Sequence, residues 1–337
     1  MKEKLLGKTQ QEIKDIVSKY GMPAFTAKQI LNWLYIKRVS SIDEMTNLSK
    51  KHRDLLACDY EVGLEEPVHE AVSVDGTKKY LFKTGTDKLV ESVYIPDKER
   101  ATLCVSSQMG CKMNCLFCMT GKQGFNGNLT ANEIINQIFS IPDSESLTNI
   151  VFMGMGEPMD NYDELIKVLQ ILTSEWGLAW SPKRITVSTI GVEKYVRRFL
   201  DESNCHLAVS LHASYSEQRL SLMPVEKVWK MENIISLLKE YDFSKQRRLS
   251  FEYIMFHEYN DSLEDAKKLV ALLKGVDCRV NLIRFHAIPN VDLKSSDEES
   301  MIKFRDYLNN HGITCTIRSS RGEDIFAACG MLSTKKQ

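Results

Sequence analysis

Apolar and polar positions follow two alternating patterns beyond residue 100. Apolar runs of four to six residues predict strands at 103–107, 150–153, 185–189, 207–211, 251–255 and 280–285. Between them, apolar residues at helical spacing predict helices at 131–140, 162–175, 193–200 and 263–273. Strands that alternate with helices are typical of a parallel sheet. We therefore expect an α/β fold whose six βα units form a partial (β/α)6 barrel, followed by a strand at 314–318.

The first sixty residues show a helical pattern. An apolar stripe is interrupted by Lys37 and Arg38, and it consists of Ile30, Leu31, Trp33, Leu34 and Ile36. Ser49 is placed to cap a further helix at 50–56. These features predict a small helical accessory domain at 1–66.

Residues 70–96 show strand-like alternation around two turn signals, Asp75-Gly76 and Gly85-Thr86-Asp87. This pattern predicts a β-meander that links the helical domain to the core. The expected boundaries are therefore 1–66 for the helical domain, 67–96 for the β-meander and 97–337 for the catalytic core.

Charge is unevenly distributed along the 337 residues. Residues 1–53 contain 11 Lys and Arg against 5 Asp and Glu, so they carry +6 and the remainder carries −7, for a net −1. A basic N-terminal domain on a mildly acidic core fits docking of a polyanion such as RNA. The alternative is an ordinary solvated helical surface.

Nine cysteines in a chain of this length are too sparse and irregular for a secreted disulfide framework. They indicate a reducing compartment and metal or redox chemistry. The first residues lack the apolar run of a signal peptide, and no stretch has the length of a membrane span. We therefore expect a cytoplasmic protein that does not bind membranes.

Cys111, Cys115 and Cys118 have the spacing C-x3-C-x2-C, directly after a predicted strand. Structural zinc needs four ligands, whereas a [4Fe-4S] cluster held by three cysteines leaves one iron open. In radical enzymes that open iron binds S-adenosylmethionine, and the aromatic Phe117 fits their motif. The alternatives are a chance cluster or a zinc knuckle completed by a distant ligand.

Polar residues follow several predicted strands, at the end where a barrel gathers its active site. After 150–153 comes a glycine-rich turn with Gly156 and Glu157, whose carboxylate could accept from the amino group of S-adenosylmethionine. The other candidates at strand ends are Ser188, Ser210, Leu211, His212 and His286. Each also has an ordinary explanation, as a turn, a helix cap or a surface histidine.

Two further cysteines are candidates for chemistry. Cys329 lies in a tail of small residues that could place its thiol at the barrel mouth, and Cys104 precedes the three-cysteine loop by seven residues. The remaining cysteines are expected to be buried small apolar residues, and they are Cys58, Cys205, Cys278 and Cys315.

With these motifs the sequence resembles, over nearly its whole length, the RlmN family of radical S-adenosylmethionine RNA methyltransferases, to which Cfr is related. The resemblance rests on the segments at 90–96, 103–108, 110–118, 152–158, 210–212, 281–283 and 324–330. It implies a radical S-adenosylmethionine barrel that methylates the adenine C2 carbon. The implied substrates are large-subunit ribosomal RNA, near the peptidyl transferase centre, and certain tRNAs, beside the anticodon.

The family resemblance also implies cofactors and partners. They are a [4Fe-4S] cluster held by the three cysteines, two S-adenosylmethionine molecules per turnover, and an electron donor such as flavodoxin. An amidine-type C–H carbon cannot attack a sulfonium methyl group, so a radical route is chemically reasonable. We expect the enzyme to be a monomer.

Residue roles follow from the same resemblance. Cys329 would accept a methyl group, lose a hydrogen atom to the 5′-deoxyadenosyl radical and add to the adenine. Glu91 would accept the C2 proton, and Cys104 would form a transient disulfide with Cys329 to free the product. The implied S-adenosylmethionine contacts are Gly156, Glu157, Ser188, Ser210, Leu211, His212 and His286. His286 departs from the family, which has asparagine there.

Three rival functions remain. A Cfr-like enzyme would methylate adenine C8 instead, although the Gly-Glu-Pro turn and the Arg321-Gly322 pair favour RlmN. A radical S-adenosylmethionine oxidoreductase would share the cluster, but it has no need of both Cys104 and Cys329. A non-catalytic RNA-binding protein would hold zinc rather than iron at the three cysteines.

Overall fold

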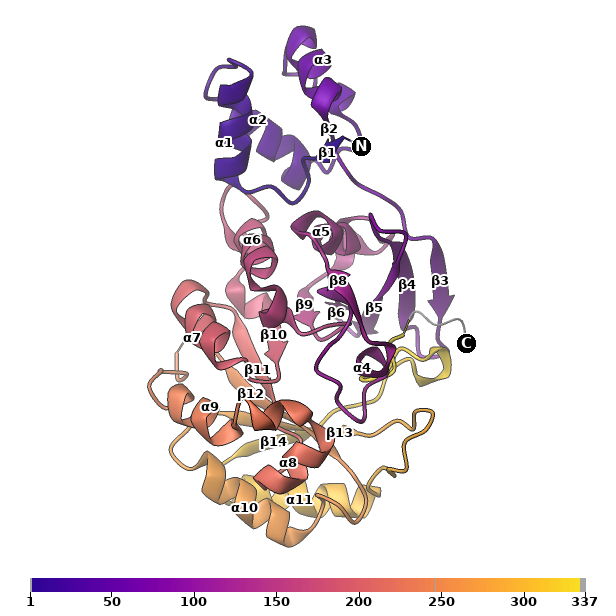
Figure 1. Ribbon diagram of the computed structural model, residues 1–337, viewed down its shortest axis with the longest axis vertical. Helices are drawn as coiled ribbons and strands as arrows, with labels where there is room; N and C mark the ends of the chain where they lie inside the picture. Colours follow the sequence, from indigo (N-terminus) through magenta and orange to yellow (C-terminus); the bar gives the residue numbers. More distant parts are fainter. Residues whose placement is uncertain (1, 246, 334–337) are drawn as a thin grey trace.

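The computed structural model describes residues 2–245 and 247–333 (Figure 1). One sheet of ten strands organises them, in the order β14-β13-β12-β11-β10-β9-β6-β5-β4-β3. Its seven parallel strands are β6 (Arg100–Cys104), β9 (Asn149–Phe152), β10 (Ile185–Thr189), β11 (His206–Ser210), β12 (Leu249–Met255), β13 (Arg279–Arg284) and β14 (Thr314–Ile317). The predicted strands are confirmed, but β6 ends at Cys104 and not at residue 107. Within the described residues β14 and β3 are free edges, so the barrel is open.

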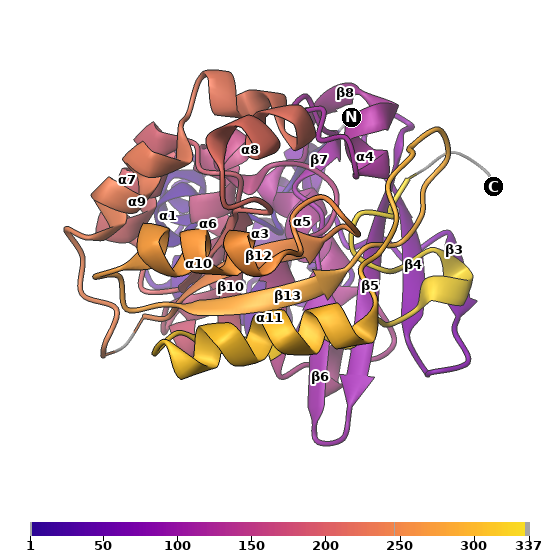
Figure 2. The same ribbon diagram turned by 90° about the horizontal axis from the view of Figure 1, so that it is seen from below.

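Helices cover the outer face of the parallel strands, and Figure 2 shows α10 and α11 there. The predicted helices are present as α5 (Ala131–Phe139), α6 (Tyr162–Thr173), α7 (Glu193–Glu202) and α10 (Leu263–Leu273). Capping boxes fix the starts of α5 and α10, where Thr130 and Ser262 accept from the third backbone N–H of each helix. The structure adds the helices α4 (Met119–Gln123), α8 (Ser216–Leu222), α9 (Met231–Leu238) and α11 (Glu298–Asn310).

The N-terminal residues form the predicted helical unit. Its helices are α1 (Gln10–Lys19), α2 (Thr26–Leu31), which continues as a π-helix at Asn32–Ile36, and α3 (Lys50–Asp59). Ser49 caps α3 as predicted, since its side chain accepts from the backbone N–H of His52. A parallel pair, β1 (Glu3–Lys4) with β2 (Tyr60–Glu61), closes the unit. Figure 1 shows this unit at one end of the molecule, beyond α5 and α6.

The predicted β-meander is also present. It comprises β3 (His69–Val72), β4 (Lys78–Lys83) and β5 (Leu89–Asp97), paired antiparallel. Because β5 pairs with β6, the meander extends the central sheet and carries more than a linking role. A smaller antiparallel pair, β7 (Gln108–Gly110) and β8 (Phe125–Asn128), flanks the segment that contains the three cysteines.

The core lies between the parallel sheet and its outer helices, with Phe152, Phe199 and Phe251 fully buried. Every residue of β12 is buried, as expected for a strand covered on both faces. No helix in the described part of the chain combines the length and hydropathy that crossing a bilayer requires.

Candidate active site

The loop that carries the three cysteines is held by backbone hydrogen bonds on several sides. Cys111 donates its N–H to the Gly124 carbonyl at 3.1 Å, and Leu116 donates to the Leu222 carbonyl at 2.9 Å. Gly110 has a φ of +79°, and a Cβ there would lie 1.7 Å from the Gly124 oxygen. Only glycine fits so close an approach of two backbone segments, so the loop shape is set by sequence at this point.

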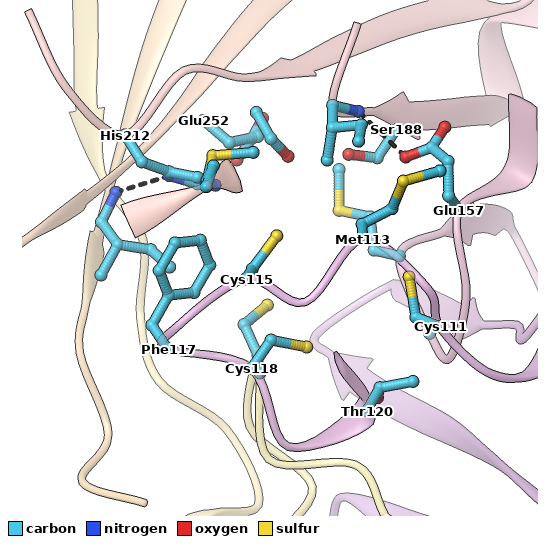
Figure 3. A pocket seen from close by; sticks show the side chains of 18 of the residues that line it. Cys111, Met113, Cys115, Phe117, Cys118, Thr120, Glu157, Ser188, His212 and Glu252 are labelled. Carbon is cyan, nitrogen blue, oxygen red and sulfur yellow. Dashed lines mark hydrogen bonds between the residues drawn. The ribbon is translucent and has the colours of Figure 1, made fainter. Parts of the chain in front are cut away.

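Cys111, Cys115 and Cys118 line one cavity at the carboxyl ends of the parallel strands. It contains about 840 Å³ of unfilled space, part of it open to solvent. Figure 3 shows the three cysteines along one wall, with Glu157, Ser188, His212 and Glu252 along the opposite wall. The predicted collection of strand-end residues into one mouth is therefore present in the structure.

The environment of the three thiols suits a metal cluster. Burial raises the pKa of Cys111 to about 12 and the pKa of Cys115 well above its usual value, so a cation is needed to hold these groups as thiolates. Among residues 2–245 and 247–333, no three Cys, His, Asp or Glu side chains converge on a single ion. The thiolates of a [4Fe-4S] cluster each bind a different iron, so three cysteines spaced along one loop suit such a cluster.

Glu157 and Gly156 form the turn after β9. Glu157 is buried, and its two carboxylate oxygens accept from the backbone N–H groups of Met159 and Ile190, both at 3.0 Å. Burial raises the pKa of Glu157 to about 7. Gly156 has a φ of +98°, and a Cβ there would lie 2.5 Å from the side chain of Gln108. Both residues line the cavity, together with Ser188 and Ser210.

His212 presents one ring nitrogen to the cavity. Its Nδ1 accepts the backbone N–H of Ile254 at 3.0 Å, so the proton of the neutral ring is assigned to Nε2. The ring meets Phe117 edge to face at 4.9 Å. Burial lowers the pKa of His212 to about 3, which keeps the imidazole neutral. Leu211 does not line the cavity, because its side chain is fully buried in the core.

Cys104 and Cys329 line a second cavity, which adjoins the first and contains about 1440 Å³ of unfilled space. Cys329 and Cys118 line both cavities, so Cys329 lies between the cysteine loop and Cys104. Burial and the neighbouring Cys329 raise the pKa of Cys104 to about 12, although the charge of Arg318 acts in the opposite direction. Cys329 itself is exposed.

The segment that carries Cys329 is attached to two other parts of the fold. Asp324 accepts from the Ser73 hydroxyl at 2.6 Å and from the Val74 N–H at 3.2 Å, in the β3–β4 turn. On the other side of Cys329, the Gly330 carbonyl accepts from the Met119 N–H at 2.8 Å. These bonds hold the segment across the barrel mouth.

Glu91 and His286 occupy different positions from the other candidates. Glu91 lies on β5 and is buried, and it is not among the described residues that line either cavity. Its Oε1 lies 3.1 Å from Lys79 Nζ. Burial raises its pKa, and Lys79 partly offsets that rise. His286 lines the second cavity and not the first, with Nδ1 3.2 Å from Glu323 Oε1.

Arg318 and Glu252 are site residues that the sequence pattern at the strand ends did not indicate. Arg318 lines both cavities, and its Nη1 lies 3.3 Å from Glu252 Oε2. Burial alone would lower the pKa of Arg318, but Cys329 and Glu252 raise it. Glu252 is a carboxylate inside the apolar strand β12, and that anomaly is a signal visible in the sequence.

An open parallel barrel with a three-cysteine loop at its mouth defines the class of radical S-adenosylmethionine enzymes. A family model described as "Radical SAM superfamily" matches residues 105–271. A second, described as "Ribosomal RNA large subunit methyltransferase N-terminal domain", matches residues 3–62.

Known proteins identify the family within that class. A protein of Phocaeicola vulgatus named "Probable dual-specificity RNA methyltransferase RlmN" is 65% identical over 100% of this chain and 96% of its own length. The "Dual-specificity RNA methyltransferase RlmN" of Nautilia profundicola is 41% identical over 93% of this chain and 94% of its own length. The crystal structure of a radical SAM methyltransferase from Sphaerobacter thermophilus matches with a TM-score of 0.91 and 37% identity, over 98% of each chain.

The chain belongs to the RlmN family, and it is an S-adenosylmethionine-dependent RNA methyltransferase. The family, the fold class and the enzyme class predicted from the sequence are thereby confirmed.

Proposed function

We propose that this enzyme methylates C2 of an adenosine in large-subunit ribosomal RNA and of an anticodon-adjacent adenosine in certain tRNAs. The description of the model that matches residues 3–62 supports the ribosomal substrate. The name "dual-specificity" of relatives that align over nearly the whole chain supports a second RNA substrate. The choice of C2 rests on the family resemblance of the motifs.

The observation that carries the cysteine mechanism is the position of Cys329, which lines the cavity of the three-cysteine loop and also that of Cys104. A methyl group on the Cys329 sulfur would face the first cavity. Cys104, in the second, would be placed to attack that sulfur later. One exposed thiol therefore connects methyl transfer with product release.

Cys111, Cys115 and Cys118 are proposed to hold a [4Fe-4S] cluster, and two S-adenosylmethionine molecules are used per turnover. When bound, these groups supply the methyl group and the radical that removes a hydrogen atom from it. Gly156, Glu157, Ser188, Ser210 and His212 would contact S-adenosylmethionine from the opposite wall. Leu211 would act only through its backbone, and His286 would contact the cofactor from the second cavity.

In the proposed reaction, the methylene carbon on the Cys329 sulfur bonds to C2 of the adenine. Rearomatisation of the adduct requires the loss of one electron, which the cluster held by Cys111, Cys115 and Cys118 would accept, and of the C2 proton, which would pass to Glu91 beside the positive charge of Lys79. The Cys104 thiolate attacks the Cys329 sulfur, and the S–C bond breaks. Its electron pair passes to the carbon, which takes up a proton and becomes the methyl group. The resulting disulfide is reduced by an external thiol before the next turnover.

We further propose that the protein acts as a monomer in the cytoplasm, where its RNA substrates are made, and that a flavodoxin-type carrier supplies electrons. Sedimentation of the anaerobic protein with and without RNA tests the monomer. Reduction kinetics with purified flavodoxin test the donor.

The deciding experiment is product analysis. Anaerobically purified enzyme is incubated with S-adenosylmethionine, a reductant and ribosomal RNA or tRNA, and the digested nucleosides are identified by mass spectrometry. We expect 2-methyladenosine together with 5′-deoxyadenosine, and iron with sulfide in the protein. 8-Methyladenosine would assign the Cfr-like activity instead, and zinc without any product would contradict the cysteine mechanism.

A further inference from the structure

A third concave surface opens at the amino ends of the parallel strands, and its lining shares Arg100 and Arg318 with the second cavity. It contains about 1720 Å³ of unfilled space, part of it open to solvent, and residues at the amino ends of β6, β9, β11, β12 and β13 line it. Seven Lys and Arg but only two Asp and Glu line it, a local net charge of +5 in a chain of net −1. We call this surface the basic cavity.

Four cations of the basic cavity have no partner to neutralise them. The side chains of Arg100, Lys183, Arg248 and Arg279 form no hydrogen bond or ion pair with other residues in the described part of the chain. They act on one another instead, because burial, Arg279 and Arg100 together lower the pKa of Arg248. The same surroundings act on His206: burial first, then Arg248 and Lys183, lower its pKa to about 4.

Each of these cations lies within two residues of the start of a parallel strand, so the sheet itself arranges them around one opening. A concave surface with one sign of charge concentrates counter-ions, and guanidinium groups match phosphate oxygens in a two-pronged geometry. The lining also offers hydrogen-bonding groups that phosphates and sugars use, in Asn149, Thr186 and Ser250. Within the described residues, Arg100, Lys183, Arg248 and Arg279 have no ion-pair partner. The phosphates of an RNA backbone would neutralise their charge.

We propose that the basic cavity binds backbone phosphates of the substrate RNA, at a distance from the adenine that reacts. The inference rests on RNA being the substrate class of this enzyme. The basic cavity would position a large RNA through phosphate contacts that are independent of base sequence. The barrel mouth would stay free for the extruded nucleotide.

A small acidic electron carrier fits this position poorly. Electrons must reach the cysteine loop, and β12, seven residues long, spans roughly 23 Å between the two ends of the barrel. β13 begins at the basic cavity with Arg279, and its arrow points away from it, toward the side on which α4 lies (Figure 2). The basic cavity therefore opens at the end of the strands away from the cysteine loop, and Met153, Glu252 and Arg318 line both it and the first cavity inside the barrel.

The test compares two double variants of the holoenzyme. Arg248→Gln/Arg279→Gln removes two charges from the basic cavity, and the control Lys267→Gln/Lys303→Gln removes two exposed charges from α10 and α11. RNA affinity is measured by fluorescence anisotropy with a ribosomal RNA fragment over a range of salt concentrations. Each lost phosphate contact lowers the slope of log K against log salt by about 0.9. We expect a slope smaller by about 2 and affinity roughly tenfold weaker at low salt in the first variant only.

Iron content and RNA-independent cleavage of S-adenosylmethionine should stay at wild-type levels in both variants. Wild-type slopes in Arg248→Gln/Arg279→Gln would overturn the proposal. The proposal is also overturned if Arg248→Gln/Arg279→Gln binds RNA normally but binds tripolyphosphate more weakly. The same holds if it binds RNA normally but is reduced more slowly by flavodoxin. Methylation of the same RNA by the wild type is measured in parallel. If the wild type does not methylate this RNA, the proposed substrate is wrong. If the wild type methylates it normally and the variant has an unchanged salt slope, the basic cavity does not bind RNA phosphates.

Discussion

Ser333 donates its backbone N–H to Glu91 Oε2 at 2.8 Å, which joins the segment after Cys329 to the centre of β5. The other carboxylate oxygen faces Lys79, whose Nζ also lies 3.5 Å from the Phe326 carbonyl. Glu91 therefore contacts residues 326–333 directly through Ser333 and indirectly through Lys79. These contacts tie Glu91 to the segment that contains Cys329, although Glu91 itself lines neither cavity.

Replacing Lys79 should therefore change the pH dependence of catalysis. Burial already raises the pKa of Glu91 and Lys79 counteracts it, so Lys79→Met should raise that pKa further. A base works only when deprotonated, so the acidic limb of the pH–rate profile should move to higher pH by about one unit. The measurement is the methylation rate as a function of pH.

Lys83→Met is the matched control, since Lys83 lies on the same strand and pairs only with the exposed Asp87. Its profile should coincide with that of the wild type. An unshifted profile in Lys79→Met would remove Glu91 from the role of proton acceptor.

Cys329→Ala should abolish methylation, by about 10³-fold or more, because no other described residue offers a thiol to both cavities except Cys118, which is assigned to the cluster. Iron and sulfide content should be unchanged, since Cys329 is exposed and lies outside the three-cysteine loop. The readout is methylated adenosine per enzyme, with iron analysis of the same sample. Retained methylation in this variant would defeat the cysteine mechanism.

Cys104→Ala should stop the reaction after the covalent bond between Cys329 and the adenine has formed. In the proposed mechanism, forming the carbon–carbon bond does not involve Cys104, whereas cleaving the S–C bond depends on its attack on Cys329. We expect a covalent protein–RNA adduct on denaturing gels and less than one turnover per enzyme. Cys205→Ala, which changes a buried cysteine that lines none of the three cavities, should turn over normally. Normal turnover without adduct in Cys104→Ala would assign product release to another group.

The sequence predicted those parts of the molecule whose cause is local. Runs such as the one that forms β12 are apolar because one face packs against the outer helices and the other lies inside the barrel, and the spacing of Cys111, Cys115 and Cys118 lies within eight residues. Likewise, Ser49 caps α3 through a contact only three residues away. The cysteine loop and most strands could therefore be found without knowledge of the fold.

What the sequence did not reveal depends on contacts between distant segments. Arg318 reaches Glu252 across 66 residues, and no local pattern predicts that pair. Barrel active sites lie at the carboxyl ends of strands, and this rule does not select Arg100, Arg248 and Arg279, which lie at amino ends. Cations at the starts of several predicted strands are the signal in the sequence for the basic cavity.

A buried ion pair lies behind the wall of the first cavity and should contribute strongly to the free energy of unfolding. Arg219 and Glu226 are almost fully buried and pair directly, and Arg219 Nη2 also donates to the carbonyls of Ile190 and Ser210, at 2.8 and 3.1 Å. These carbonyls follow or end β10 and β11, so one guanidinium ties two strand ends together. Arg219→Met would leave the Glu226 carboxylate buried without its partner.

We expect Arg219→Met to lower the free energy of unfolding by about 3–5 kcal/mol in urea titrations. Arg198→Met, which breaks an exposed pair with Glu202, should cost about 1 kcal/mol or less. The double variant Arg219→Met/Glu226→Gln should lose less than the sum of its single changes, because the stranded charge is gone. Equal losses in the buried and the exposed variants would show that Arg219 does not stabilise the strand ends.

The helical unit at the N-terminus offers a final prediction about RNA docking. Asn132 on α5 donates to the Gly63 carbonyl at 2.9 Å, and a Cβ on Gly7 would lie 2.4 Å from the Asn132 nitrogen. Deleting residues 1–60 would therefore uncover α5 and mix folding defects with binding defects. Lys50→Gln/Lys51→Gln instead removes two exposed charges from the start of α3.

If this unit contacts RNA phosphates, Lys50→Gln/Lys51→Gln should weaken RNA binding several-fold and lower the salt slope by about 1 to 2, with iron content unchanged. Lys267→Gln/Lys303→Gln again serves as the control of equal charge. Combining these changes with Arg248→Gln/Arg279→Gln should add the two slope reductions, because the sites lie on separate elements and neutralise different phosphates. A Lys50→Gln/Lys51→Gln variant that binds RNA like the control would mean that the N-terminal charge is an ordinary solvated surface.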